Sequence, residues 1–204
     1  MGAFENRIVN LIEEILGSKA ERQKTFDWLL NTHMSVENKQ AMDTLDCIFI
    51  GLSGDKAKLL EKRKRKLRVD AYFEKENLAI EIDELQHFTE FRLKTLNIIN
   101  TSKDIDIGFN IDEYKRYCQE NYTRAIEKGQ PGYRKPKLEF PFEYGRAYQR
   151  AYFDSMRDIL FPVYLKKSII RISELELVLI DSDEDLRKHI EGKLKVYVEI
   201  FKRD

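Results

Sequence analysis

The amino-acid sequence predicts an α/β protein in which a mixed central sheet is flanked by helices. Two observations support this class. The expected order is helices, then a strand meander, then a helix and a strand, and two segments near residues 70 and 80 alternate apolar with polar residues as half-buried strands do. The 204 residues hold no internal repeat and no linker rich enough to separate two folding units. Residues 1–204 are therefore expected to form one domain.

The segments before the alternating pair predict two helices and a buried strand. Residues 4–16 place apolar side chains on one helical face, and Gly17 ends the pattern. A second helix is expected over about 19–31, and the apolar segment 45–52 (LDCIFIGL) predicts a buried strand. The stretch 53–66 is polar and connects this strand to the next one.

The alternating pair places acidic residues on a sheet face. Residues 67–73 (LRVDAYF) turn Asp70 to the face opposite the apolar side chains, and residues 78–83 (LAIEID) do the same with Glu81 and Asp83. If the two strands pair as a hairpin, the three carboxylates converge. Carboxylates this close repel each other, so the cluster is unfavourable without a cation to offset it. Carboxylate oxygens are the ligands that Mg²⁺ prefers, and Mg²⁺ supplies what phosphodiester hydrolysis requires, an activated water and charge neutralisation.

The chain beyond the hairpin is expected to be mainly helical. The predicted elements are a helix over 89–100, a helix from Asn110 to about Lys128, a basic aromatic loop over 130–142, a helix over 143–161, a strand over 168–173 and a terminal helix opened by Ser182. Asn110 is expected to cap its helix and Gly129 to stop it. Ser182 and the acidic residues after it resemble a capping box.

Composition indicates a folded globular protein, because 42% of the residues are apolar and 11% are aromatic. Charged residues reach 35%, but 36 basic side chains balance 36 acidic ones, so net charge does not indicate a polyanionic partner. A nucleic-acid-binding protein with this balance must segregate its charges, with a basic groove around a small acidic pocket.

Cysteine spacing and hydropathy exclude several classes of protein. Cys47 and Cys118 form no CxxC pair, which argues against a zinc ribbon, an iron–sulfur cluster and a disulfide framework. The first ten residues hold no apolar signal segment, and no apolar run is long enough for a membrane span. We expect a soluble cytoplasmic protein with no membrane partner.

Two sets of basic residues are candidate nucleic-acid contacts. One precedes the first acidic strand, and solvated surface charge is the alternative interpretation. The other lies in the segment 97–148, where tyrosines are interleaved with the cations, and the alternative there is a helical subdomain whose tyrosines pack against the core. The candidates are Lys62, Arg63, Lys64, Arg65, Lys66, Arg68, Lys115, Arg116, Arg134, Lys135 and Lys137.

The hairpin carries a resemblance to a known superfamily. Residues 68–88 (RVDAYFEKENLAIEIDELQHF) resemble the catalytic hairpin of the PD-(D/E)XK, or restriction-endonuclease-like, nucleases, and are most like the branch that contains the very-short-patch repair endonucleases. In that branch a strand reading roughly V-D-F-Y is followed by a turn, by I-E-I-D and then by a histidine. Here Val69-Asp70-Ala71-Tyr72 and Ile80-Glu81-Ile82-Asp83 hold those places, and Gln86-His87 follow.

Two further segments support the resemblance. The branch continues with a helix containing R-D and then an apolar strand, which this chain matches with Arg157-Asp158 and with residues 169–174. Glu5 lies in an N-terminal helix where the branch often places an auxiliary acidic residue. The resemblance covers residues 1–30, 67–88 and 150–178, and it leaves 31–66 and about 97–148 unmatched. The latter segment is expected to be a helical insertion in a restriction-endonuclease-like core.

The resemblance implies an endonuclease that depends on Mg²⁺, with Mn²⁺ as a substitute. Asp70 would be the central metal ligand and Glu81 a second. Asp83 stands where many members have lysine, which leaves the water-activating group open. The candidates are Asp83 through a second metal ion, Gln86 as a polar positioning group, and His87 as a general base.

The implied substrate is double-stranded DNA in a restriction, repair or mobile-element setting. Site-specific restriction is favoured over mismatch repair, because the insertion is large and the zinc-type Cys/His pattern of the repair enzymes is absent. A homodimer would let two active sites cut both strands, but the sequence indicates no dimer surface. One alternative is a catalytically inactive nucleic-acid-binding module of the same fold, which the missing lysine favours. Another is an interaction protein that binds no nucleic acid.

Overall fold

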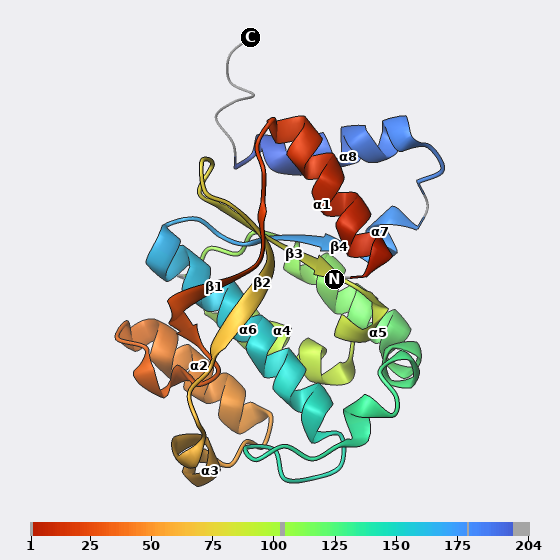
Figure 1. Ribbon diagram of the computed structural model, residues 1–204. Helices are drawn as coiled ribbons and strands as arrows, with labels where there is room; N and C mark the ends of the chain where they lie inside the picture. Colours follow the sequence, from red (N-terminus) through yellow and green to blue (C-terminus); the bar gives the residue numbers. More distant parts are fainter. Residues whose placement is uncertain (1, 103–104, 179, 198–204) are drawn as a thin grey trace.

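The computed structural model describes residues 2–102, 105–178 and 180–197, and these form an α/β fold around a four-stranded mixed sheet (Figure 1). The strands are β1 (Glu21–Leu30), β2 (Lys66–Phe73), β3 (Leu78–Asp83) and β4 (Ile170–Ser173), and they lie in this order in the sheet. The pairs β1–β2 and β2–β3 are antiparallel, whereas β3 and β4 are parallel. The predicted α/β class with a mixed sheet is therefore confirmed.

Helices cover both faces of the sheet. The α-helices are α1 (Ala3–Leu16), α2 (Lys39–Gly51), α3 (Lys56–Glu61), α4 (Glu90–Thr101), α5 (Ile111–Lys128), α6 (Gly145–Leu165), α7 (Glu174–Leu177) and α8 (Asp183–Lys195). Short 3₁₀ turns are η1 (His33–Ser35), η2 (Leu85–His87) and η3 (Gly132–Arg134). Helices α1 and α8 lie together on one face, and α6 crosses the other face with α2 and α4 behind it (Figure 1). None of the described helices is long and apolar enough to cross a membrane.

The two faces of the β2–β3 hairpin differ as the alternation predicted. Ala71, Ile80 and Ile82 pack with the apolar residues of α1 and α8 in one buried cluster. Tyr72 and Ala79 belong to the cluster on the opposite face, where α6 lies. Asp70 and Glu81 line a pocket with residues of α6, and Asp83 pairs with Arg171 beside the same helix, so the three carboxylates lie on the α6 side. Val69 also packs in the α6-side cluster, although alternation predicts it on the face of Ala71.

Two predicted elements are wrong. The segment 19–31 forms β1 instead of a helix, and its backbone pairs with β2. Phe26 packs edge-on against Phe161 of α6, and Trp28, two residues on, stacks against Tyr164 of the same helix. The segment 45–52 belongs to helix α2 instead of a strand, and Leu45, Ile48 and Phe49 are fully buried at helical spacing. Segment 45–52 spans only eight residues, and an apolar run this short does not distinguish the 3.6-residue period of a buried helix from the two-residue period of a strand.

Other predicted elements are confirmed within a few residues. Helices α1, α4, α5, α6 and α8 and strands β2, β3 and β4 occupy the predicted places. The Asn110 side chain accepts a hydrogen bond from the Glu113 N–H and caps α5, as predicted. The Ser182 side chain accepts from the Asp185 N–H at the start of α8. The polar stretch 53–66, expected as a connection, also contains the short helix α3.

The segment 97–148 contributes α5 and η3 to the connection between β3 and β4. Helix α5 packs against α4 and η2. Tyr114, Tyr117 and Tyr133 are buried, whereas Tyr122 is 51% exposed. Three of the four tyrosines therefore pack in the interior, which was the alternative to a stacking role.

Candidate functional site

Asp70 and Glu81 lie opposite each other on neighbouring strands. The β2–β3 register pairs Ala71 with Ile80, so that the next position pairs Asp70 with Glu81. The Asp70 carboxylate accepts a hydrogen bond from the Ile82 N–H (2.9 Å), and the Glu81 carboxylate accepts one from the Asp70 N–H (3.2 Å). Each acid thus binds the backbone of the opposite strand where the regular ladder ends, which fixes both carboxylates on the α6 face.

Gln23 continues this row of polar side chains onto β1. The register places it opposite Asp70, and its amide nitrogen donates to the second oxygen of that carboxylate (3.2 Å). Its backbone is left-handed, with φ of 53°, a region that a residue with a side chain adopts at a cost.

These acids line a pocket of about 130 Å³ between the sheet, α1 and α6. The lining residues are Glu5 from α1, Asp70, Glu81 and Ile82 from the hairpin, His87 from η2, and Arg146, Arg150, Phe153, Asp154 and Arg157 from α6. The α6 residues recur every three or four positions, which places them on one face of the helix. The structure thus brings together the predicted Glu5, Asp70, Glu81 and His87.

The pocket disfavours negative charge on Asp70 and Glu81. Burial raises the pKa of Asp70, and the nearby Glu5 raises it further. Burial raises the pKa of Glu81 well above its ordinary value, although Arg157 acts in the opposite direction. Desolvation and like charge penalise carboxylates unless a cation is close. The two acids are therefore in surroundings that a bound cation would make more favourable.

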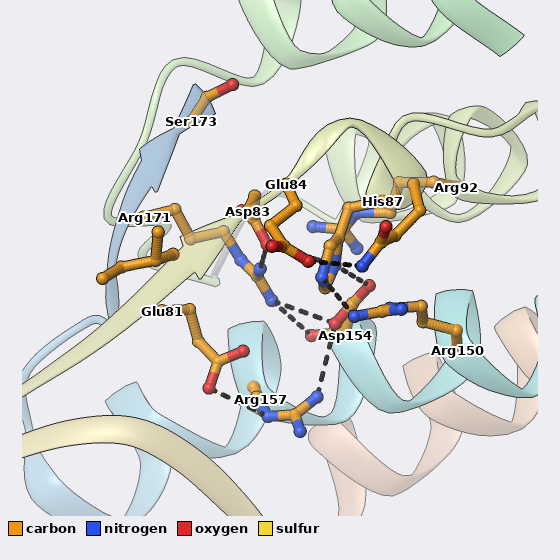
Figure 2. A network of polar contacts seen from close by, with 12 residues as sticks. Glu81, Asp83, Glu84, His87, Arg92, Arg150, Asp154, Arg157, Arg171 and Ser173 are labelled. Carbon is orange, nitrogen blue, oxygen red and sulfur yellow. Dashed lines mark hydrogen bonds and ion pairs between the residues drawn. The ribbon is translucent and has the colours of Figure 1, made fainter. Parts of the chain in front are cut away.

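Arg157 lies beside the two acids. Its Nε is 3.3 Å from a Glu81 oxygen, and its Nη1 is 3.3 Å from Asp154 (Figure 2). Nε and Nη2 also donate to the backbone carbonyl of Arg68. The guanidinium is anchored by β2 and α6 at once, and it offsets part of the Glu81 charge.

Asp83 lies outside the pocket lining. One of its oxygens is 2.6 Å from Arg171 Nη1, and the other accepts from the Tyr114 hydroxyl at 3.1 Å. Asp83 and Arg171 are each 1% exposed. Burial opposes ionisation of Asp83, but Arg171 and His87 hold its pKa below the ordinary value. The predicted three-acid cluster is thus divided, with Asp83 engaged in a neighbouring ion-pair network.

That network is buried between β4, α4 and α6. Arg171 Nε is 2.7 Å from one oxygen of Asp158, and Arg92 Nη2 is 2.6 Å from the other. Arg171 also donates to the Asp154 backbone carbonyl. Burial opposes ionisation of Asp154, but the hydrogen bond from His87 and the charge of Arg171 hold its pKa well below the ordinary value. The network joins β4 to α6 and so fixes the helix that lines the pocket.

The hydrogen-bond partners of His87 define which ring nitrogen carries the proton. Its Nε2 lies 2.7 Å from Arg150 Nη2, and its Nδ1 lies 3.0 Å from Asp154 and 3.2 Å from Asp83 (Figure 2). A guanidinium can only donate, so Nε2 accepts and the ring proton is on Nδ1. In this arrangement Arg150 engages the lone pair that a general base would use. The neighbouring Gln86 lies outside the pocket lining. Its side-chain amide donates to Glu84, and its backbone carbonyl accepts from the Tyr133 hydroxyl.

The basic run before β2 borders a second pocket, a basic groove of about 440 Å³. Phe153 lines both this groove and the acidic pocket. The predicted contacts that line the groove are Lys62, Arg63, Arg65, Lys66 and Lys137. The predicted contacts outside both pockets are Lys64, Arg68, Lys115, Arg116, Arg134 and Lys135. Lys115, Arg116 and Arg134 lie within ion-pair distance of nearby acids. The structure thus brings about half of the predicted basic contacts together beside the acids.

The α6 side of the pocket was not predicted as part of the site. In the sequence, Arg157 and Asp158 are recognised only as part of a family motif. Arg146 and Arg150 are not predicted as site residues. A signal was present, because charged residues recur at helical spacing along a segment that is otherwise apolar and aromatic. A helix that buries such a face directs its charges inward.

No group of three or more His, Cys, Asp or Glu side chains is positioned to hold a metal ion in residues 2–102, 105–178 and 180–197. The present contacts account for this. Glu81 is directed at Arg157, Asp70 at Ile82 and Gln23, and Asp83 at Arg171.

One family model matches the chain. It describes a family of unknown function (DUF7255) and covers residues 48–134, which is less than half of the chain. The matched segment includes the acidic hairpin, His87, α4 and α5, and it excludes α1, α6 and β4. No curated protein and no solved structure matches the chain.

Proposed function

We propose that the protein is a Mg²⁺-dependent endonuclease of restriction-endonuclease-like fold that hydrolyses phosphodiester bonds in double-stranded DNA. One observation carries the proposal: Asp70 and Glu81 lie opposite each other in a pocket that adjoins a basic groove. This is the segregation of charge that a nucleic-acid-binding protein without net charge requires.

The side chains in the pocket fit a hard cation in their chemistry. Glu5, Asp70 and Glu81 offer carboxylate oxygens. Burial raises the pKa values of Asp70 and Glu81, so a cation bound beside them would favour their charged forms. These three residues would hold Mg²⁺ or Mn²⁺, and the proposed ligand set omits Asp83 because Arg171 engages it. A bound divalent ion would supply charge neutralisation at phosphorus and activation of water.

The remaining groups have roles that follow from their contacts. Gln23 and the Ile82 N–H orient Asp70, and Arg157 orients Glu81. The groove is lined by Lys62, Arg63, Arg65, Lys66 and Lys137 and accommodates the phosphate backbone. Each phosphate that it neutralises adds about 0.9 to the salt slope on duplex DNA.

A second candidate function is a nucleic-acid-binding module without catalysis. The position of Arg157 favours it, since a guanidinium 3.3 Å from Glu81 already provides a cation where the metal would bind. Such a module would bind DNA through the same groove, without cleavage and without a requirement for Mg²⁺.

Incubation with supercoiled plasmid and Mg²⁺ or Mn²⁺ tests the proposal, with linear duplex RNA as a second substrate. Asp70→Asn and Glu81→Gln should each reduce cleavage on the order of 100-fold or more, because each removes a metal ligand that contributes several kcal/mol. Glu14→Gln, an exposed glutamate of α1, is the matched control and should retain full activity.

Cleavage that survives both substitutions would exclude this centre. DNA binding without cleavage, in wild type and variants alike, would select the non-catalytic module. Cleavage of RNA alone would retain the centre and reassign its substrate.

A further inference from the structure

Arg146 and Arg150 line the acidic pocket without a carboxylate partner. Arg150 Nη1 donates to the Tyr133 hydroxyl (3.3 Å) and Nη2 to His87 Nε2 (2.7 Å), while Arg146 Nη1 donates to the Gln149 side-chain oxygen (2.5 Å). All three acceptors are neutral. Within the described residues, no carboxylate lies within ion-pair distance of either guanidinium.

This contrasts with the other arginines around the pocket. Arg157 pairs with Glu81 and Asp154, and Arg171 pairs with Asp83 and Asp158. Partly buried cations are normally paired, because removing a charge from water is expensive unless an opposite charge compensates. Burial and the charge of Arg150 lower the pKa of Arg146, whereas Tyr133 and Asp154 raise the pKa of Arg150 despite its burial. Arg146 is therefore the less compensated of the two cations.

The size of the pocket indicates what kind of anion fits. Its volume of about 130 Å³ is well below the roughly 300–1,000 Å³ of a site for a drug-sized ligand. It therefore admits a phosphate group and excludes a nucleoside. Guanidinium groups suit phosphate because their planar N–H donors match its oxygens in pairs.

The position of the two arginines connects the pockets. They lie one helical turn apart on α6, on the same face as Phe153 and Arg157. Phe153 also lines the basic groove, as does Gln149, which accepts the Arg146 hydrogen bond. A strand that runs along the groove toward Asp70 would pass these arginines.

We propose that Arg146 and Arg150 form a phosphate-binding site that holds one phosphate of the nucleic-acid strand beside the acids. The identity of that strand rests on the proposed function, whereas the affinity for a phosphate group does not. The phosphate is either a terminal monoester or an internal diester, because both present the same oxygens to the arginines.

Binding of a fluorescent oligonucleotide in EDTA tests the site without cleavage. Arg146→Gln and Arg150→Gln should each weaken binding about tenfold, the loss expected for one charged hydrogen-bonding contact. Each should also lower the salt slope by about 0.7 on a single strand or about 0.9 on a duplex. Arg187→Gln is the matched control, because this partly exposed arginine of α8 lies outside both pockets, and it should bind within about twofold of wild type.

Oligonucleotides with a 5′-phosphate, a 3′-phosphate or two hydroxyl ends separate the two sources. A preference of tenfold or more for one phosphorylated end, abolished by Arg150→Gln, assigns a terminal phosphate. Equal binding of all three, weakened in both variants, assigns an internal one. Inorganic phosphate alone should raise the melting temperature of the wild type more than that of Arg150→Gln.

Binding of both variants within twofold of wild type would overturn the site. If Arg150→Gln does not fold, the binding of Arg146→Gln tests the site. The native Arg146 side chain makes one hydrogen bond, to Gln149 on the same helix, so its replacement should leave the fold intact. Arginine-dependent binding without any cleavage in Mg²⁺ would retain this site and reject the nuclease. Cleavage with unaffected binding would do the reverse.

Discussion

Replacement of Arg171 by methionine should destabilise the protein strongly. Arg171 is 1% exposed, and its guanidinium forms charged hydrogen bonds of 2.6 Å to Asp83 and 2.7 Å to Asp158. Arg171→Met removes the cation and leaves two buried carboxylates with incomplete compensation. Breaking a buried pair by removing one partner costs about 3–5 kcal/mol of the free energy of unfolding.

Arg7 provides a matched control for that experiment. It forms an ion pair with Asp183 at the same 2.6 Å, but both side chains are largely exposed, at 62% and 91%. Arg7→Met should lower the free energy of unfolding by about 0.5 kcal/mol, the usual magnitude for a solvated pair. Urea unfolding near neutral pH measures both variants, with wild type as reference.

Acidification adds a second readout. Arg171 holds the pKa of Asp83 below its ordinary value, so wild type loses this stabilisation as the pH falls. The variant lacks the stabilisation from the start, so its deficit in unfolding free energy relative to wild type should narrow as the pH falls toward about 4. A loss for Arg171→Met within about 1 kcal/mol of that for Arg7→Met, constant with pH, would refute the assignment of a buried charge network.

Two further predictions concern the pocket and its neighbour. Burial raises the pKa of Glu81 above the ordinary 4.5, so the folded protein retains a proton that the unfolded chain has released, and stability should fall as pH rises above that value. Glu81→Gln should therefore gain stability relative to wild type between about pH 5 and about pH 8, measured as melting temperature, and a constant difference would contradict the raised pKa. Tyr114→Phe should lower the free energy of unfolding in urea by about 1.5 kcal/mol, because the hydroxyl donates to the buried Asp83. Tyr122→Phe, at an exposed position, should leave that free energy unchanged. Equal effects of the two substitutions would count against the contact between Tyr114 and Asp83.

The acidic half of the pocket could be predicted because it depends on local pattern. Asp70 and Glu81 lie in short strands separated by a tight turn, and alternation alone assigns them to one face. Helices with clear caps, such as the one that begins after Asn110, could be predicted for the same reason. Segments 19–31 and 45–52 could not, because the pairing of β1 with β2 and the burial of α2 are tertiary effects that override local preference.

The ion-pair network beside the pocket depends on contacts between residues that are distant in the sequence. Asp83 is engaged by Arg171, 88 residues further along the chain, and no local pattern identifies that partner. An arginine in an otherwise apolar strand nevertheless indicates a buried acid opposite it. This reasoning does not extend to Arg150, whose hydrogen-bond acceptors are the neutral Tyr133 hydroxyl and His87 ring.

The order of the elements along the chain has a consequence for biosynthesis. The hairpin carries its acids from residue 70 onward, but Arg157 and Arg171 follow only after α4 and α5. A nascent chain that has reached the end of α5 exposes Asp70, Glu81 and Asp83 to water without their cations. Such long-range closure is intrinsically slow to form. The pocket therefore matures late, after most of the polypeptide has left the ribosome, and a fragment that ends before α6 should present the acids as an ordinary solvated hairpin.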